Sequence, residues 1–214
     1  MSFDPAALSA QRYTTKVYDP SRQIPEAQLQ QLLAVLRNSP SSVNSQPWHF
    51  FVIGSEAGKK TIEPALTELN RPRAGNASHV VVFTVRTDFT DAHLVRLLEQ
   101  ESRDGRFVNE DARKAQDAGR RFFVEYNRQR DLLGWESRQA YIALGTLLFG
   151  AASLGIDATP IEGFDRAALD AALGLEQKGL TSVVLAALGY RSADDFNAPL
   201  PKSRLPQEEV VTFL

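Results

Sequence analysis

The sequence predicts one domain of mixed helices and strands, of the α+β or the α/β class. Amphipathic helical stretches are interspersed with short apolar runs that are typical of buried strands, and helices are in the majority. The 214 residues contain no internal repeat, no low-complexity tract and no evident linker. A chain of this length can form one sizeable domain or two small ones, and we expect a single domain spanning residues 1–214.

The composition is that of an ordinary soluble globular protein, with 43% hydrophobic and 23% charged residues. The net charge of −2 gives no broad basic face, so nucleic acid is not an expected partner. The absence of cysteine excludes disulfides, thiolate catalysis and thiolate metal sites. The three histidines are scattered without ligand-like spacing, so no metal site is expected. The N-terminus has no apolar run behind a basic start, so we expect no secretory signal and a cytoplasmic location.

Two helices and an extended segment are expected before residue 39. Asp4-Pro5 begins the first helix, because an acidic cap followed by proline is a common helix start. Residues 12–18 are rich in β-branched and aromatic residues, which favours an extended conformation. The cations of this segment, Arg12 and Lys16, fit either a solvated edge strand or a phosphate site. The next helix begins at residues 24–26. Its buried face is predicted from the i, i+3, i+4, i+7 spacing of Leu29, Leu32, Leu33 and Leu36.

The loop at residues 39–49 carries more polar and stiff residues than a simple turn needs. It contains two prolines, four serines, an Asn, a Gln and a Trp. Two interpretations fit this composition: a capped helix end whose Trp48 plugs the core, or a binding loop on a rigid scaffold. The apolar run 50–53 follows as a short buried strand.

The clearest strand lies at residues 78–85, which are apolar and largely β-branched. Before it, a helical stretch begins at Gly54-Ser55 and is interrupted by Pro64. Residues 70–73 are then expected to form a second polar loop with two cations.

Two helices follow this strand. Residues 91–100 place leucines on one side, and the turn Asp104-Gly105-Arg106-Phe107 ends that helix. Residues 110–130 form a long charged helix with a sparse apolar face of Phe122, Phe123 and Tyr126. Such a helix is expected to lie on the surface or to project over something.

The helix expected at residues 135–154 imitates a membrane span, because residues 140–156 carry no charge. The uncharged stretch is short for a bilayer and contains three glycines. We therefore expect a helix that is buried on all sides, in a core or between subunits, and no membrane association.

The last third of the chain adds two strands and a helix. Residues 158–164 end a strand with a proline, an isolated acid and a glycine, and Asp165 caps the helix 166–173. Residues 181–188 form another buried strand. The proline-rich tail carries Lys202 and Arg204, and residues 209–214 look like a strand without a hairpin partner. A terminal strand of this kind often pairs with a distant edge or with another subunit.

Six of these segments occur in the order found in one protein family. They are residues 12–16, 39–50, 77–83, 104–107, 160–164 and 200–206. Together they resemble the flavin-dependent nitroreductases, and within that family the oxygen-insensitive NAD(P)H nitroreductases of enterobacteria, also described as dihydropteridine reductases. The resemblance implies an α+β fold with a mixed central sheet surrounded by helices. It also implies an intertwined homodimer with C-terminal strand exchange and one FMN at each of two interface sites.

The resemblance also implies which residues bind FMN. Arg12, Thr14, Lys202 and Arg204 match the phosphate-binding set, and Tyr13 replaces a family histidine beside them. Lys16 matches a lysine near the flavin N1 and O2 atoms, where a positive charge stabilises the reduced ring. Asn70 matches the amide at the pyrimidine edge. Pro160 and Ile161 match residues on one ring face, and the Glu162-Gly163 turn places backbone N–H near the flavin N5. Ser41, Ser42 and Asn44 match residues that reach FMN from the partner chain.

The other ring face would be open to NAD(P)H and then to the oxidant. Phe123 matches an aromatic residue that covers this face. Arg73 and Arg106 match cations near the nicotinamide cofactor, with Lys16 beside them, although Arg73 stands where close relatives have lysine. The implied activity is ping-pong hydride transfer to small molecules, namely nitroaromatics, quinones or pterin-like acceptors, with no side chain assigned as acid or base. The alternatives are a flavin reductase or another specialised flavin reductase of the same fold, and a non-enzymatic flavin-binding dimer.

Overall fold

A central four-stranded sheet organises the molecule. The computed structural model describes residues 4–214, so the first three residues, which belong to the region assessed for a secretory signal, lie outside it. The strands are β1 (Trp48–Ile53), β2 (His79–Arg86), β3 (Asp157–Ile161) and β4 (Leu180–Gly189), in the order β1-β2-β4-β3. All three pairings are antiparallel. A mixed sheet was expected, which requires some parallel pairing. Among residues 4–214, the parallel pairing consists of the single bridge between Thr14 and Ala158.

Helices surround this sheet. They are α1 (Pro5–Gln11), α2 (Glu26–Arg37), α3 (Glu56–Ile62), α4 (Arg71–Asn76), α5 (Asp91–Arg103), α6 (Glu110–Arg128), α7 (Leu132–Ser153), α8 (Arg166–Leu173) and α9 (Gln207–Val210). Residues 4–214 also contain three short 3₁₀ turns, namely η1 (Ser42–Asn44), η2 (Glu63–Ala65) and η3 (Glu176–Lys178).

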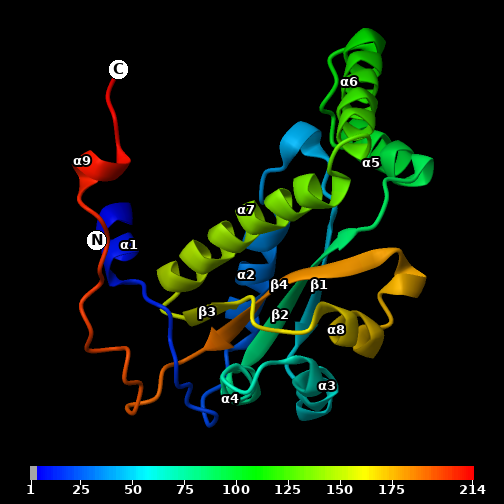
Figure 1. The fold of residues 1–214 in the computed structure, drawn as a ribbon. Coiled ribbons are helices and arrows are strands. Elements are labelled where there is room, and N and C mark those ends of the chain that lie inside the picture. Colours follow the sequence, from blue (N-terminus) through cyan, green and yellow to red (C-terminus); the bar gives the residue numbers. More distant parts are fainter. Residues whose placement is uncertain (1–3) are drawn as a thin grey trace.

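The two faces of the sheet are covered by different helices (Figure 1). Side chains alternate along a strand, so β2 sends Val81, Phe83 and Val85 to one face and Val80 and Val82 to the other. The first face packs against α2 and α7, and the second against α3, α4 and α8. The central strands are therefore apolar on both faces, which explains their continuous apolar sequence.

The expected caps and helix faces are present. The Asp4 and Asp165 side chains accept backbone N–H groups at the starts of α1 and α8. Leu29, Leu32 and Leu36 are buried on α2, as their spacing predicts. Within residues 4–214, none of the helices combines the length and apolar content that a bilayer crossing requires.

Two local expectations were wrong. The polar loop expected at residues 70–73 is replaced by the helix α4 over residues 71–76, with Pro72 in the first turn, where a missing N–H is tolerated. The strand expected at residues 209–214 does not form within this chain, because residues 207–210 are helical and residues 211–214 are in no strand.

The two long helices agree with the sequence as far as one chain can test them. α6 lies on the surface, with its three aromatic residues exposed and Arg120 and Val124 buried. One side of α7 is exposed at Tyr141 and Ile142, so its own chain does not bury it on all sides, and its burial between subunits stays a prediction.

Candidate functional site

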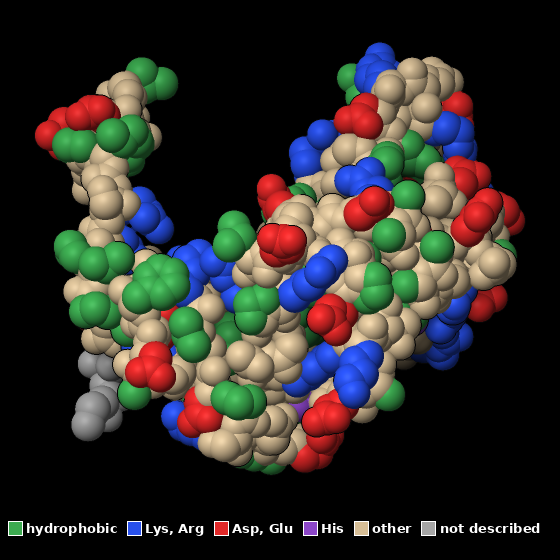
Figure 2. Space-filling model, turned by 60° about the horizontal axis from the view of Figure 1, so that its bottom comes forward, with side chains coloured by type: hydrophobic (Ala, Val, Ile, Leu, Met, Phe, Trp, Pro, Cys, Tyr) green, Lys and Arg blue, Asp and Glu red, His purple; other side chains and the backbone are tan. Residues whose placement is uncertain are grey.

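A small polar cavity forms where the two ends of the chain meet. It has a volume of about 260 Å³ and is lined by residues 12–14, Asn197 and residues 200–204. Lys202 closes it, because its ammonium donates to the Ser9 carbonyl at 2.5 Å and to the Arg12 carbonyl. In Figure 1 the C-terminal segment runs beside α1, and Figure 2 shows Lys and Arg side chains near the base of this segment.

This cavity has the electrostatics of an anion site. It is lined by the cations Arg12, Lys202 and Arg204 and by no carboxylate. Burial, and then the charges of Arg12 and Arg204, lower the pKa of Lys202 below its ordinary value. The Arg12 Nη1 atom is buried and has no hydrogen-bond partner. A buried donor without a partner is unfavourable, and a phosphate dianion would supply both the acceptor and the missing charge.

The segment that carries Arg12 is held by a carboxylate that the sequence did not single out. Asp195 is buried and accepts hydrogen bonds from the Tyr13 hydroxyl at 2.7 Å and from the Lys16 backbone N–H at 3.1 Å. Burial and this hydrogen bond raise the pKa of Tyr13 to about 12. No helix or strand pattern surrounds Asp195, so the sequence contains no signal for its role.

A second group of predicted residues surrounds the start of α4. The Asn70 amide donates to the Gly163 carbonyl at 3.0 Å, and its oxygen accepts from Arg73 Nη1 at 2.7 Å. Burial, and then the charge of Arg73, lower the pKa of Lys16, whereas the charge of Asp195 opposes this effect. A Cβ atom on Gly163 would lie only 2.5 Å from the Asn70 amide nitrogen. This group therefore combines cations and an oriented amide with a turn that fits only glycine without rearrangement.

The end of β3 leads into the same turn. The Ile161 side chain is buried in the core, so only its backbone can face a ligand from this chain, whereas Pro160 is partly exposed. Glu162 accepts a hydrogen bond from the Tyr141 hydroxyl at 2.5 Å. Burial and this bond raise the pKa of Tyr141 to about 12. Both residues line an open cavity of about 440 Å³ beside β4. Tyr141 was missed because its position on an uncharged helix is also typical of packing.

The loop predicted to bind a ligand has a strained backbone. Val43, Asn44 and Gln46 have φ values of 49°, 52° and 41°. Left-handed backbone is uncommon for residues other than glycine, above all for a β-branched residue, and it persists only where the surroundings enforce it. The loop's polar composition is thus used to hold an unfavourable conformation.

Contacts from three helices enforce this conformation. Gln139 accepts the Ser42 N–H at 2.8 Å, and Asn44 donates to Glu101 at 2.8 Å. Arg120 donates to the Val43 carbonyl at 3.1 Å and pairs with Glu101 at 2.6 Å. Both side chains of this ion pair are almost fully buried, and no pattern in the sequence indicates the pair.

The predicted site residues thus fall into two groups within one chain. The first group lies around the β3 edge of the sheet and comprises residues 12–16, 70–73, 160–163 and 202–204. The second group, residues 41–44, lies near the N-terminal end of α7, away from that edge (Figure 1). Phe123 on α6 and Arg106 in the loop before α6 are also on that side, in the part that projects from the body. Trp48 is partly buried and stacks on Phe50, with ring centroids 5.8 Å apart, so it anchors the loop to the core.

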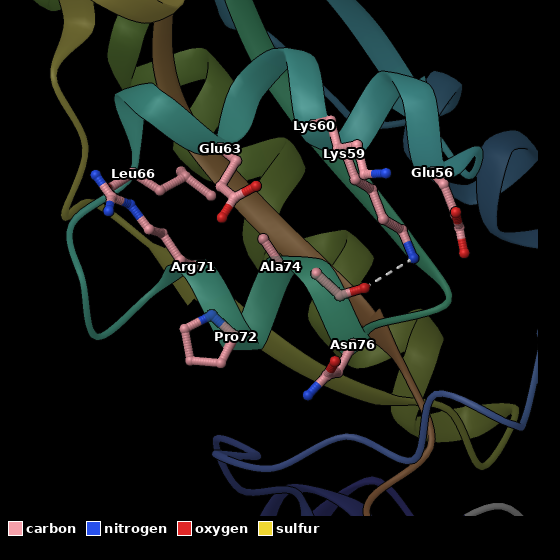
Figure 3. A pocket seen from close by; sticks show the side chains of 10 residues that line it. Glu56, Lys59, Lys60, Glu63, Leu66, Arg71, Pro72, Ala74 and Asn76 are labelled. Atoms are coloured by element: carbon pink, nitrogen blue, oxygen red, sulfur yellow. Dashed lines mark hydrogen bonds between the residues drawn. The ribbon is translucent and has the colours of Figure 1, made fainter.

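A further cavity of about 610 Å³ lies between α3 and α4 and contains none of the predicted site residues (Figure 3). Its lining mixes both charge signs. The Lys59 ammonium donates to the Gly75 carbonyl at 3.2 Å and to the Ala77 carbonyl, so it caps the end of α4. Among residues 4–214 there is no group of three or more His, Asp or Glu side chains that could hold a metal ion.

Comparison with known proteins gives consistent matches over the whole chain. A model of the nitroreductase family matches residues 10–190. The chain is 44% identical to the oxygen-insensitive NAD(P)H nitroreductase of Salmonella typhimurium, covering 98% of this chain and 99% of that protein. It is 41% identical to the enzyme of the same name from Enterobacter cloacae, with 98% and 99% covered. It is 38% identical to the major NAD(P)H-flavin oxidoreductase of Aliivibrio fischeri, with 95% of each chain covered.

A solved structure shows the same fold. A protein from Exiguobacterium sibiricum, described as a nitroreductase and solved in complex with FMN, superposes with a TM-score of 0.84 at 24% identity. The match covers 100% of this chain and 99% of that one.

Proposed function

Because this chain belongs to the nitroreductase family, we propose that it is an FMN-dependent NAD(P)H oxidoreductase that reduces nitroaromatics, quinones or pterin-like acceptors. The carrying observation is the cluster of Arg12, Lys202 and Arg204 around a cavity without a carboxylate. Three cations at one place are unfavourable unless an anion joins them, and the FMN phosphate has the required charge. The orphaned Arg12 Nη1 atom and the glycine turn at Gly163 both fit this cofactor.

The chain's own residues would then have defined tasks. Arg12, Thr14, Lys202 and Arg204 bind the phosphate, with Tyr13 beside them. Lys16 places a positive charge at the edge of the ring, where it favours the reduced anion. Asn70 would bind the pyrimidine edge, and its hydrogen bond to the Gly163 carbonyl orients its amide for this. Pro160, Glu162, Gly163 and the backbone of Ile161 would form the wall on one face of the ring. When bound, FMN supplies two-electron hydride transfer in ping-pong order.

We further propose that the active unit is a homodimer of single-domain chains. Ser41, Ser42 and Asn44 would complete the partner's FMN site, because the structure separates them from the cation cluster of their own chain. Phe123, Arg73, Arg106 and Lys16 would contact NAD(P)H or the acceptor.

The exposed apolar surface supports this assembly. The C-terminal segment stands away from the body and exposes Leu205 and Phe213, and α7 exposes Tyr141 and Ile142. Figure 2 shows a wide hollow between this segment and the α5–α6 projection, which a second copy would fill. Truncation after Pro206 should remove the proposed exchanged strand. The truncated protein is then expected to elute later than the full chain at low concentration, and an unchanged elution volume would contradict strand exchange.

Two measurements test the enzymatic proposal. The purified protein should be yellow, or should retain yellow FMN after unbound flavin is removed, and NADPH or NADH should bleach the bound flavin under anaerobic conditions. A protein that is colourless and retains no added FMN would refute the cofactor, and flavin that stays oxidised would indicate a non-enzymatic binding protein. We also propose a cytoplasmic location, because the proposed reaction consumes NAD(P)H.

A flavin reductase is the second candidate, favoured by the 38% identity to the flavin oxidoreductase of Aliivibrio fischeri. Steady-state rates with free FMN and with nitrofurazone separate the two. Faster turnover of nitrofurazone supports the nitroreductase, and faster turnover of free FMN supports the flavin reductase.

A further inference from the structure

Asp195 is a buried carboxylate in a segment without helix or strand, and it belongs to none of the predicted site residues. Only 2% of its surface is exposed. It accepts the Tyr13 hydroxyl at 2.7 Å, the Lys16 N–H at 3.1 Å and the Asn197 N–H at 3.3 Å. A carboxylate is buried at a large loss of hydration unless donors replace the water. Two of its three donors belong to the segment that carries the predicted cofactor ligands.

That segment is held along both of its edges. On one edge, Thr14 bridges to Ala158 and the Thr15 carbonyl accepts from the Thr159 hydroxyl at 2.5 Å. On the other edge, the Lys16 N–H binds Asp195, and the Thr14 carbonyl accepts from the Asn197 amide at 2.7 Å. The two side chains replace the backbone partners that a neighbouring strand would provide.

The two ends of this held segment face different parts of the site. Arg12 and Thr14 line the cation cavity, whereas the charge of Lys16 interacts with that of Arg73 on α4. We propose that Asp195, assisted by Asn197, is a positioning residue that fixes residues 13–16 so that both ends engage one bound FMN. This inference rests on the proposed function. Burial and the charge of Arg73 lower the pKa of Lys16, and the negative charge of Asp195 opposes this lowering.

The charge and the hydrogen bonds of Asp195 can be separated by two substitutions. Asp195→Ala removes both, and should raise the Kd for FMN about tenfold or more, measured by flavin fluorescence. Asp195→Asn keeps the shape, because its oxygen can accept the Lys16 N–H and its amide can donate to the Tyr13 oxygen. It should keep the Kd within about threefold of the wild type and lower the pKa of Lys16. Asp194→Ala is the matched control, since this neighbouring carboxylate is exposed, and it should change neither quantity.

A second readout does not depend on FMN. Hydrogen exchange of the Lys16 amide, measured in the full-length protein, should accelerate in Asp195→Ala and stay slow in Asp194→Ala. Should the wild type fail to bind FMN, the proposed function is refuted, while this exchange still decides whether Asp195 holds the segment. Should Asp195→Ala fail to fold, Tyr13→Phe and Asn197→Ala each remove one contact and should each weaken FMN binding. Wild-type affinity together with wild-type exchange in the folded variants would overturn the proposal.

Discussion

The buried ion pair under the strained loop gives the sharpest test of how this fold supports its site. Arg120 and Glu101 are 2.6 Å apart, and their side chains are 0% and 5% exposed. Arg120 also donates to the carbonyl of Val43, whose φ is 49°. In Arg120→Met, the Glu101 carboxylate would remain buried without its counter-ion, and the Asn44 amide would still donate to it. Removing one member of a buried pair lowers the free energy of unfolding by about 3–5 kcal/mol.

This loss is large enough to measure directly. For a chain of this size, each kcal/mol shifts Tm by roughly 2–4 °C, so Tm should fall by about 6–20 °C. Urea denaturation should give the same loss in the free energy of unfolding. Both measurements need one fixed protein concentration, because the stability of a dimer depends on it.

The next residue on α6 provides the matched control. Arg121 pairs with Asp91 at 2.5 Å and with Asp117 at 2.9 Å, but its side chain is 38% exposed. Exposed ion pairs contribute about 0–1 kcal/mol, so Arg121→Met should stay close to the wild type. Equal losses in the two variants, or a loss below about 1 kcal/mol in Arg120→Met, would refute the reasoning.

A double replacement separates stability from loop support. Arg120→Met with Glu101→Leu removes both charges, so it should recover much of the stability that the single variant loses. It restores neither the hydrogen bond to Val43 nor the one from Asn44. FMN binding should therefore be weaker than in the wild type in both the single and the double variant, and wild-type binding by the double variant would show that the loop conformation does not depend on this pair.

Three further predictions concern the site and the core. Lys202→Ala with Arg204→Ala should raise the Kd for FMN about a hundredfold or more, because two charge-assisted contacts are lost. Flavin should then appear in the filtrate on ultrafiltration, and retained flavin would contradict the phosphate site. Gly163→Ala places a methyl carbon 2.5 Å from the Asn70 amide, so stability should fall by about 1–3 kcal/mol, with weaker FMN binding. An unchanged melting curve would show that the turn adapts freely. Burial raises the pKa of Glu136 to about 8 from an ordinary value of 4.5. The folded state therefore keeps a proton that the unfolded chain releases, and this group lowers stability as pH rises from about 5 to about 8. Glu136→Gln should remove that part of the pH dependence and be the more stable protein at pH 8. If the free energy of unfolding changes with pH in the same way for the wild type and Glu136→Gln, this reasoning is contradicted.

Local elements followed from the sequence where the pattern and the cap agreed. Asp165 and the following residues gave α8, and the leucines of α2 gave its buried face. The error at residues 71–76 has a tertiary cause, since this short helix is capped at its end by Lys59, which comes from another helix. A helix of this length is marginal alone, because its few hydrogen bonds do not offset the cost of nucleation. The local sequence of α4 contains no information about this contact with Lys59, so the helix could not be predicted from it.

The sequence by itself determined most of the helices and strands, the two covered faces of the sheet and the residue types of the candidate site. These depend on hydrophobic periodicities of two residues in strands and 3.6 residues in helices, which involve only residues close together in the sequence. Only the tertiary structure decided how the site is built. The Tyr13–Asp195 hydrogen bond joins residues 182 positions apart, and the Arg120–Glu101 pair forms where two helices meet. Such contacts depend on how the chain closes on itself. The cations of the two chain ends therefore share one cavity, while the strained loop lies at the far end of α7.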